Sequence, residues 1–560
     1  MSIASILWDR DILIAAAALL LSLLLLRIYL AAVRRSMMRA ADAPRVSTVV
    51  PSAMPPVRNP AVAMPPFRQL GIDHVEPARR RAVRAIWSGM TRTAFVQLAA
   101  GLVYALAVTL TWGWQVEQMA PDRQMTWQWV AMFTAFFAWP VVIVIVLVAT
   151  VTWRAVAAVV AAYTALLLYG MLLMTRGTPV TPAMFALNWW HINGPASVMA
   201  LVFLARPIRA MGPIVAALTV AAAIGVFGIA ELLNEGMIAR VAEIAGAMGL
   251  SGHSGAYIVS VVVFGVPALA AALIVYLALR GVGLLYQAHW ISDQSIQADA
   301  VWLVYAILQA PPQVPYMPLV SFPLYVLVSR LGHRLVRPAA ADDAAAPRLL
   351  LLRVFSLGAR SGRLFDGFAK IWRHRGSIRM IAGPDLASAT VEPHEFIDFM
   401  AGRLQRRFIT SPAMLERRLS ESQPRRDPDG RFRTAGFFCH DDTWRMALAR
   451  LARDSDLVLM DLRGFTHANQ GCVYEIHELL DAVSLDRFLL VTDATTDEAF
   501  LGEVLKQGWD RISATSRNRG DPRPGVHVYR LDQAGMEGID RLAATLAGMH
   551  KPVVPAIGPG

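Results

Sequence analysis

The stretch from Asp454 to Leu480 reads DSDLVLMDLRGFTHANQGCVYEIHELL, and its pattern decides the fold of the C-terminal part of the chain. An apolar strand at 457–462 leads into a polar loop, and the helix that follows opens at Gly471 and carries Glu475. A short apolar run between polar segments is typical of a strand buried on both faces of a sheet. Because open α/β sheets bind ligands beyond the carboxyl ends of their strands, we expect a site at the start of this helix.

Strand-like and helix-like segments alternate on both sides of this stretch. Further strands are expected at 349–357, 378–381, 437–439, 487–492 and 526–531. Amphipathic spacing predicts helices at 361–372, 392–409, 443–453 and 497–509. The polar segment 411–431, rich in Arg and Asp, is expected to be an exposed insertion. The alternation predicts βαβ units, and therefore a C-terminal α/β three-layer domain with a mostly parallel sheet at 349–545.

The N-terminal part has the composition of a membrane protein. Mean hydropathy of the whole chain is +0.45, and 56% of its residues are hydrophobic. Apolar runs long enough to cross a bilayer lie at 12–33, 94–113, 127–152, 155–175, 184–205, 211–231 and 256–279. We expect an N-terminal α-helical transmembrane bundle, with a first span in 1–40 and a multi-pass domain in 93–337. Residues 41–92, rich in Pro and Arg, are expected to form an irregular cytoplasmic loop that ends in a short basic helix.

The apolar region 300–329 leaves the number of membrane crossings open at seven or eight. Prolines interrupt it between 311 and 318. One crossing of about thirty residues would put the C-terminal domain outside the cell, whereas two half-length helices meeting at the prolines would keep it inside. A miscounted span at 184–205 is a third possibility. We expect a cytoplasmic C-terminal domain at a bacterial inner membrane, because arginines adjoin the last span between 330 and 337.

Charge and cysteine content argue against nucleic-acid binding and against a Cys/His metal site. The net charge of +12 comes almost wholly from scattered arginines, which fits cytoplasmic loops and a high-GC bacterial composition and gives no nucleic-acid platform. Cys439 and Cys472 are expected to be reduced thiols, and no Cys/His spacing predicts a metal site. Residues 338–348 are expected to be a linker, and 546–560 a flexible tail.

Few ionisable residues lie within the predicted spans. Transporters need such groups at membrane depth to bind and release ions. His191 is the one titratable candidate, and its neighbours Trp189 and Trp190 favour an interfacial position. We therefore expect an anchor or sensor in the lipid bilayer. A permease or channel with a regulatory cytosolic domain, and a non-enzymatic membrane scaffold, remain the alternatives.

Common nucleotide and hydrolase motifs are missing from the sequence, including GxxxxGK[ST], GxGxxG, GxSxG and HExxH. The glycine-bearing loop at a strand–helix junction is GARSG at 358–362. A phosphate could bind at the start of the helix that follows, near Arg360 and Arg363. The alternative is that these residues form an ordinary tight turn that binds no ligand.

The helix opening GCVYEI at 471–476 resembles an element of the Toll/interleukin-1 receptor (TIR) domain and its bacterial relatives. In that family an apolar strand precedes a helix that opens with xWCxxEL, and Gly471 stands here in place of the Trp. The resemblance implies a cytosolic domain for signalling or assembly, with homo-oligomers formed through it. Enzymatic TIR domains hydrolyse NAD with the glutamate on this helix, so the resemblance implies Glu475 as catalytic residue and NAD as a substrate.

The same resemblance implies a wall beside Glu475 from the loop after the first strand, with Ser356, Gly358, Arg360 and Ser361 as ligand-binding candidates. NAD cleavage needs a carboxylate near the ribose, because the transition state resembles the oxocarbenium ion of glycoside hydrolysis. A carboxylate stabilised by the helix dipole is the other interpretation of Glu475.

Other polar residues lie on this helix or end the neighbouring strands. Asp461 and Asp493 end neighbouring strands at one sheet edge and are further ligand-binding candidates. His477 and Glu478 are expected at the surface, and Cys472 as a small buried thiol.

Overall fold

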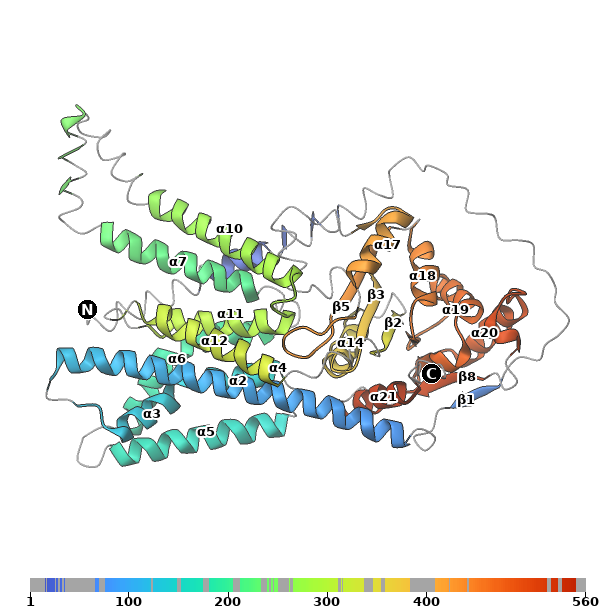
Figure 1. Ribbon diagram of the computed structural model, residues 1–560, viewed down its shortest axis with the longest axis horizontal. Coiled ribbons are helices and arrows are strands. Elements are labelled where there is room, and N and C mark those ends of the chain that lie inside the picture. Colours follow the sequence, from blue (N-terminus) through green and yellow to red (C-terminus); the bar gives the residue numbers. More distant parts are fainter. Residues whose placement is uncertain are drawn as a thin grey trace, which may run out of the picture. The chain divides into compact units, whose positions relative to one another are not determined.

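The computed structural model divides the chain into two units (Figure 1). A helical unit contains residues 93–336, and an α/β unit contains 30–92, 337–390 and 403–560. The structure describes residues 66–69, 76–121, 124–148, 153–174, 181–204, 212–232, 265–310, 314, 316–336, 346–353, 358–382, 408–422, 424–440, 443–520, 525–531 and 536–549, with short runs between 16 and 35 and between 239 and 261.

The α/β unit is built on a parallel sheet with strand order β1-β8-β7-β6-β2-β3-β5-β4. Every neighbouring pair of named strands is parallel, as expected from the sequence. The strands are β1 (Phe67–Gln69), β2 (Arg348–Arg353), β3 (Ser377–Ala382), β4 (Phe408–Ile409), β5 (Thr434–Cys439), β6 (Leu457–Asp461), β7 (Phe488–Thr492) and β8 (Val526–Arg530). The central strands β2, β6 and β7 are buried on both faces apart from Arg348 at the start of β2, which explains their continuous apolar runs.

Helices cover both faces of this sheet. They are α14 (Gly358–Trp372), α17 (Pro412–Glu421), α18 (Trp444–Arg453), α19 (Gln470–Ala482), α20 (Glu498–Asp510) and α21 (Met536–Met549). Right-handed crossovers place α14 on one face and α17 to α20 on the other. Contacts agree, since α14 packs against α21, while α19 packs against both α18 and α20. The expected three-layer arrangement of a parallel sheet with helices is confirmed.

The chain leaves the centre of the sheet in two directions. From β2 it crosses to β3 through α14, and from β6 it crosses to β7 through α19 on the opposite face. Where neighbouring connections diverge in this way, a crevice forms beyond the carboxyl ends of the two strands. The α/β unit therefore has its topological switch point between β2 and β6.

The expectation of an exposed insertion at 411–431 is wrong. Helix α17 buries Leu415 and Leu419 in the core shared with α18. The segment after it turns at Gly430 (φ 79°) and buries the ion pair between Arg431 and Asp429. Charged residues dominate this stretch of sequence, but its leucines four apart form a helix face. The helix expected at 392–409 lies outside the described residues apart from its last two, which form β4.

Two ends of the α/β unit differ from the sequence prediction. Within the expected cytoplasmic loop 41–92, β1 pairs with β8 in the register Phe67 to Val526. At the other end, α21 continues to Met549, because Leu546 and Ala547 are fully buried. The α/β unit therefore includes part of the loop and the first residues of the expected tail.

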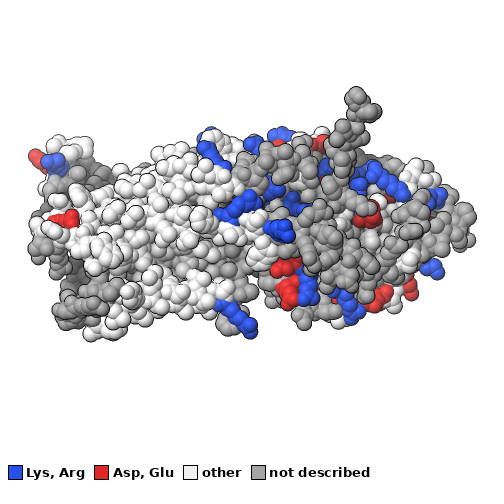
Figure 2. Space-filling view, turned by 60° about the horizontal axis from the view of Figure 1, so that its bottom comes forward, with Lys and Arg blue, Asp and Glu red and all other residues white. Residues whose placement is uncertain are grey.

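The helical unit is a group of long helices lying side by side (Figure 1). They are α2 (Glu76–Met119), which begins in the α/β unit, α3 (Trp127–Phe137), α4 (Pro140–Val148), α5 (Trp153–Met174), α6 (Pro182–Leu204), α7 (Gly212–Leu232), α10 (Val266–Gln287), α11 (Asp293–Leu308) and α12 (Met317–Leu335). Helix α11 is central, packing against α4, α6, α7 and α12. On the face shown in Figure 2, the described surface of this unit is mostly uncharged.

Three described helices are long and apolar enough to cross a membrane: Trp87–Met119, Arg154–Leu172 and Val266–Gln287. The pair α3 and α4, bent by 43°, would be a fourth if it is one span. Helix α7 contains a shorter apolar stretch, Gly212–Ile224. The region 300–329 forms the two helices α11 and α12 rather than one continuous helix.

Candidate functional site

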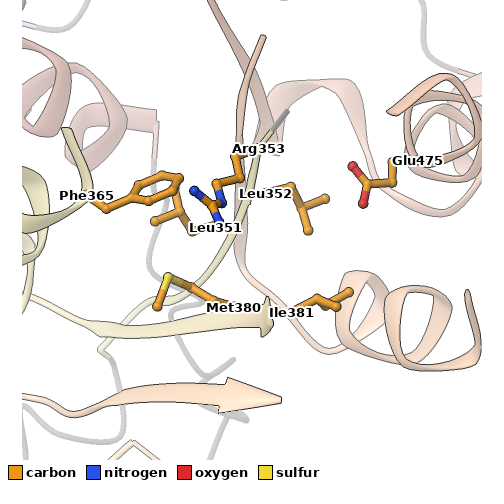
Figure 3. Close-up of a pocket in the computed structure, with 7 residues that line it drawn as sticks. All are labelled: Leu351, Leu352, Arg353, Phe365, Met380, Ile381 and Glu475. Atoms are coloured by element: carbon orange, nitrogen blue, oxygen red, sulfur yellow. The ribbon is translucent and has the colours of Figure 1, made fainter. Parts of the chain in front are cut away.

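Glu475 lies at the switch point of the sheet. The first turn of α19 meets the end of β2, where the Sγ of Cys472 lies 3.8 Å from the carbonyl oxygen of Arg353. Glu475, three residues later on the same helix, points toward the end of β2 (Figure 3). A small cavity there is lined by Leu351, Leu352 and Arg353 of β2, Met380 and Ile381 of β3, Phe365 of α14, and Glu475.

The carboxyl group of Glu475 is almost completely buried, with 1% of the residue exposed. Its Oε2 atom has no hydrogen-bond partner. Burial in these surroundings raises the pKa of Glu475 to about 8, because the charged form loses its hydration. A buried acid without a partner is costly, and such groups occur most often where a protein uses them.

Arg353 gives the same cavity a positive charge. It is buried, and its guanidinium carbon lies 5.7 Å from the centre of the Phe365 ring. Nothing in the sequence singles it out, because Arg353 stands inside the nearly continuous apolar run of the strand expected at 349–357. The cavity thus combines an acid, a guanidinium group and apolar walls. Its volume of about 10 Å³ is the room needed by one water molecule.

The carboxylates of Asp461 and Asp493 form hydrogen bonds that stabilise the loops after β6 and β7. The fully buried carboxylate of Asp461 accepts hydrogen bonds of 2.8 and 2.7 Å from the guanidinium of Arg463. The Oδ1 of Asp493 accepts hydrogen bonds from the backbone amide and the hydroxyl of Thr495, closing the turn after β7. Neither residue lines the cavity of Glu475.

The remaining candidates are placed only in part. Gly358, Arg360 and Ser361 form the first turn of α14, and their side chains lie outside the described residues, as does Ser356 altogether. Among the sequence candidates whose side chains are described, Glu475 is the one that the structure brings to the cavity.

Gly471, which stands where the TIR pattern has a Trp, has free space around it. A Cβ added at Gly471 would meet nothing within 4 Å. An aromatic side chain reaches this helix from α18 instead, where Trp444 packs edge-on against Tyr474 with ring centres 5.3 Å apart. The guanidinium of Arg445 lies over the same tyrosine ring, 4.7 Å from its centre. Helix α18 therefore supplies aromatic packing to the part of α19 that carries Tyr474.

Other residues of this region have structural roles. His477 was expected at the surface but is half-buried, with Nε2 hydrogen-bonded at 3.1 Å to the carbonyl of Val504. Glu478 is also half-buried, and burial raises its pKa. Cys439 and Cys472 are buried free thiols. The described residues contain no group of three or more His, Cys, Asp or Glu that could hold a metal ion.

The fold and the site define a doubly wound α/β domain with a buried acid at its switch point, linked to a unit of apolar helices. No protein-family model, no curated protein and no solved structure matches this chain. The resemblance to TIR domains therefore rests on the residues of the helix that carries Glu475.

Proposed function

We propose that this chain is a multi-pass membrane protein whose TIR-like α/β unit faces the cytoplasm, serves signalling or assembly, and uses Glu475 to cleave NAD. The observation that carries the proposal is the position of Glu475, a buried acid without a hydrogen-bond partner at Oε2, in a cavity at the switch point. Ligands of open α/β sheets bind at this place in the fold.

Membrane insertion is supported by the apolar surface of the helices. Helix α10 exposes Leu269, Leu273 and Leu277, spaced four residues apart, along one side. An exposed apolar stripe of this kind is unfavourable in water and matches lipid tails. The three described helices of sufficient length support the same assignment.

The pairing of β1 with β8 supports an even number of crossings between residues 93 and 337. Strand β1 precedes the span in α2, whereas β8 follows the last helix of the helical unit, yet they form one sheet. Both must therefore lie on the same side of a membrane. The Arg-rich segment 41–92 favours the cytoplasmic side. The six apolar runs of the sequence between 94 and 279 would give six crossings, and the region 300–329 would add two or none if α11 and α12 both cross or both do not.

A reporter experiment tests this topology. We expect a green fluorescent protein fused at Gly560 to fluoresce, and an alkaline phosphatase fused there to be inactive, since only the cytoplasm gives this combination. A phosphatase inserted after residue 50, within the Arg-rich loop, should be inactive as well. An active phosphatase at either position contradicts the shared cytoplasmic location.

The proposed cleavage of NAD is a hydrolysis in which Glu475 acts on the ribose. The bond between the nicotinamide nitrogen and the ribose breaks with its electron pair leaving on nicotinamide, and water adds to the ribose carbon and releases one proton to solvent, giving ADP-ribose. An ionised Glu475 would stabilise the positive charge that develops on the sugar. At pH 7 its raised pKa keeps most molecules protonated. We therefore expect kcat/KM to rise with pH toward a plateau above pH 8.

Replacement Glu475→Gln tests the catalytic role. In the full-length protein in detergent, we expect NAD consumption to fall about 10²-fold or more, because electrostatic stabilisation of the transition state is lost. The matched control is Glu478→Gln, one turn along the same helix, which should keep its activity. Release of nicotinamide measures both. Equal activity of the Glu475→Gln variant and the unmodified protein would exclude a catalytic Glu475.

The volume of the cavity favours a second candidate, an assembly domain without enzymatic activity. About 10 Å³ accommodates one water molecule, so a ribose reaches Glu475 only if the lining side chains move apart. If the full-length protein forms oligomers through the α/β unit and releases no nicotinamide at any pH between 6 and 9, this second function replaces the first.

A further inference from the structure

The turn 288–292 between α10 and α11 has a defined backbone geometry. The backbone amide of His289 donates to the carbonyl of Tyr286 at 3.0 Å. The next amide, that of Trp290, donates to the carbonyl of Leu285 at 2.9 Å. Together these bonds form the Schellman motif that closes helices, with His289 in the left-handed conformation (φ 59°) that glycine usually adopts there. Helix α10 therefore ends in one fixed geometry.

The start of α11 fixes the other end of this turn. The Oγ of Ser292 accepts a hydrogen bond from the backbone amide of Ser295 at 3.0 Å, and the Oγ of Ser295 accepts one from the amide of Ser292 at 2.8 Å. This is a capping box, and Ile291 before it shares a buried cluster with Ile296, as in a hydrophobic staple. An exposed side chain on a turn held at both ends is pre-organised for contact with a ligand.

Trp290 is such a side chain, with 59% of its surface exposed. The guanidinium carbon of Arg334, near the end of α12, lies 5.7 Å from the centre of its ring. Arg334 is exposed as well, and among the described residues no carboxylate forms an ion pair with it. Of the two acids of α11, Asp293 is buried, and Asp299 pairs with Arg330. An exposed positive charge therefore lies beside an exposed aromatic ring.

The surface of α12 that leads to Arg334 is apolar. Its exposed side chains recur every three or four residues, at Val320, Leu324, Leu327, Leu331 and Leu335. We refer to these residues as the α12 stripe, because this spacing places them along one side of the helix. In a membrane such a stripe contacts acyl chains, and the headgroups lie at its end. Arg334 and Trp290 are at that end, where α12 stops at Leu335.

We propose that Trp290 and Arg334 bind the headgroup of an anionic phospholipid whose acyl chains lie along the α12 stripe. A guanidinium group donates two parallel hydrogen bonds to a phosphate, and stacking on an aromatic ring holds it in place. Tryptophan is enriched at the level between headgroups and acyl chains. A zwitterionic headgroup also has a phosphate, but its ammonium group is repelled by the guanidinium, so a lipid with net negative charge binds more tightly.

This inference rests on the membrane insertion proposed above. In that topology the end of α12 lies at the cytoplasmic leaflet, whose anionic lipids make the surface potential negative. Arginines near helix ends also extend toward headgroups without binding a particular lipid. Arg280 of α10 is exposed between the exposed Leu277 and Leu284, and among the described residues no aromatic ring lies over it. Arg280 and Arg334 are therefore a matched pair, one without and one with the tryptophan.

The test is native mass spectrometry of the full-length protein in detergent, with phosphatidylglycerol and phosphatidylethanolamine added in equal amounts. We expect the protein to retain more phosphatidylglycerol, which is anionic, than phosphatidylethanolamine, which is zwitterionic. Arg334→Gln should lower the affinity for phosphatidylglycerol about tenfold, as for the loss of a hydrogen bond between charged groups. Arg280→Gln, the control, should retain as much as the unmodified protein. Trp290→Leu should lower retention, and Trp290→Phe, which keeps an aromatic ring, should preserve most of it.

Equal retention of the two lipids would overturn the lipid site. An equal loss in Arg334→Gln and Arg280→Gln would overturn it too, because charge alone would then attract the lipid. Membrane insertion is tested separately, by whether the protein stays in the membrane fraction after an alkaline wash. A protein that stays there without preferring phosphatidylglycerol removes the lipid site and leaves the insertion, whereas a protein absent from membranes removes both. Melting temperatures show whether Arg334→Gln still folds, and the two Trp290 variants decide the matter if it does not.

Discussion

Replacement of Asp454 by alanine lowers the free energy of unfolding of the α/β unit by about 3–5 kcal/mol, the usual effect of leaving a buried charge without its partner. The guanidinium of Arg379 is 3% exposed and donates a 2.6 Å hydrogen bond to Oδ2 of Asp454. Burial lowers the pKa of Arg379, and the carboxylate of Asp454 acts against this effect. Without Asp454 the charge of Arg379 remains buried near the start of β3, and the attraction of Asp456 is all that remains of the compensation by these two acids.

Hydrogen exchange of peptides from β6 in the full-length protein measures this change. The matched control is Glu416→Ala, which removes a carboxylate that pairs with Arg450 at the surface. An exposed pair contributes only about 0–1 kcal/mol, so the control should exchange almost like the unmodified protein.

A double variant shows whether the loss comes from the stranded charge. Arg379→Met with Asp454→Ala removes both charges and keeps most of the apolar volume, and such replacements of a buried pair are often neutral. We therefore expect the double variant to recover most of the stability lost in Asp454→Ala. A double variant as unstable as the single one would show that Asp454 acts mainly through Arg348, to which it is also bonded at 2.9 Å.

The parallel sheet could be predicted from the sequence because its central strands are buried on both faces and read as uninterrupted apolar runs. The same rule fails for β1 and β4, whose three and two residues are too few to form such a run. Their pairing depends on β8 and β5, which are far away in sequence. Helix α17 was missed for another reason, since its two buried leucines are surrounded by charged residues.

The candidate site could be located from the sequence but not assembled from it. Glu475 follows a buried strand, and that position is sufficient to place it at the sheet edge. Whether a carboxylate at this edge can bind a ligand depends on the residues around it. Asp461 cannot be judged from its position in the sequence, because Arg463 forms an ion pair with it in the folded chain. The sequence also hid the pair of Asp299 and Arg330, which belong to different helices and appeared to lie outside any membrane span.

The stability of the α/β unit should depend on the ionisation of Glu475. Its pKa is about 8 in the folded state and near 4.5 when unfolded, so the folded state holds the proton more tightly. Below pH 4.5 both states are protonated, and the residue has no effect. As pH rises from 4.5 to 8, unfolding releases a proton and becomes more favourable, by up to about 5 kcal/mol at 1.36 kcal/mol per pH unit.

Glu475→Gln resembles the protonated acid at every pH, so the variant should match the unmodified protein at pH 4.5 and exceed its unfolding free energy by up to about 5 kcal/mol at pH 8.5. Hydrogen exchange of β6 peptides, compared between the two proteins at each pH, measures the difference. His374, whose pKa burial lowers to about 3, titrates in both proteins and cancels. Glu498→Gln, an exposed control on α20, should change little at either pH. A stability difference that is the same at pH 4.5 and pH 8.5 would mean that Glu475 is not a buried neutral acid. The same result would also remove the expected rise of NAD cleavage with pH, because that rise depends on ionisation of Glu475 in this range.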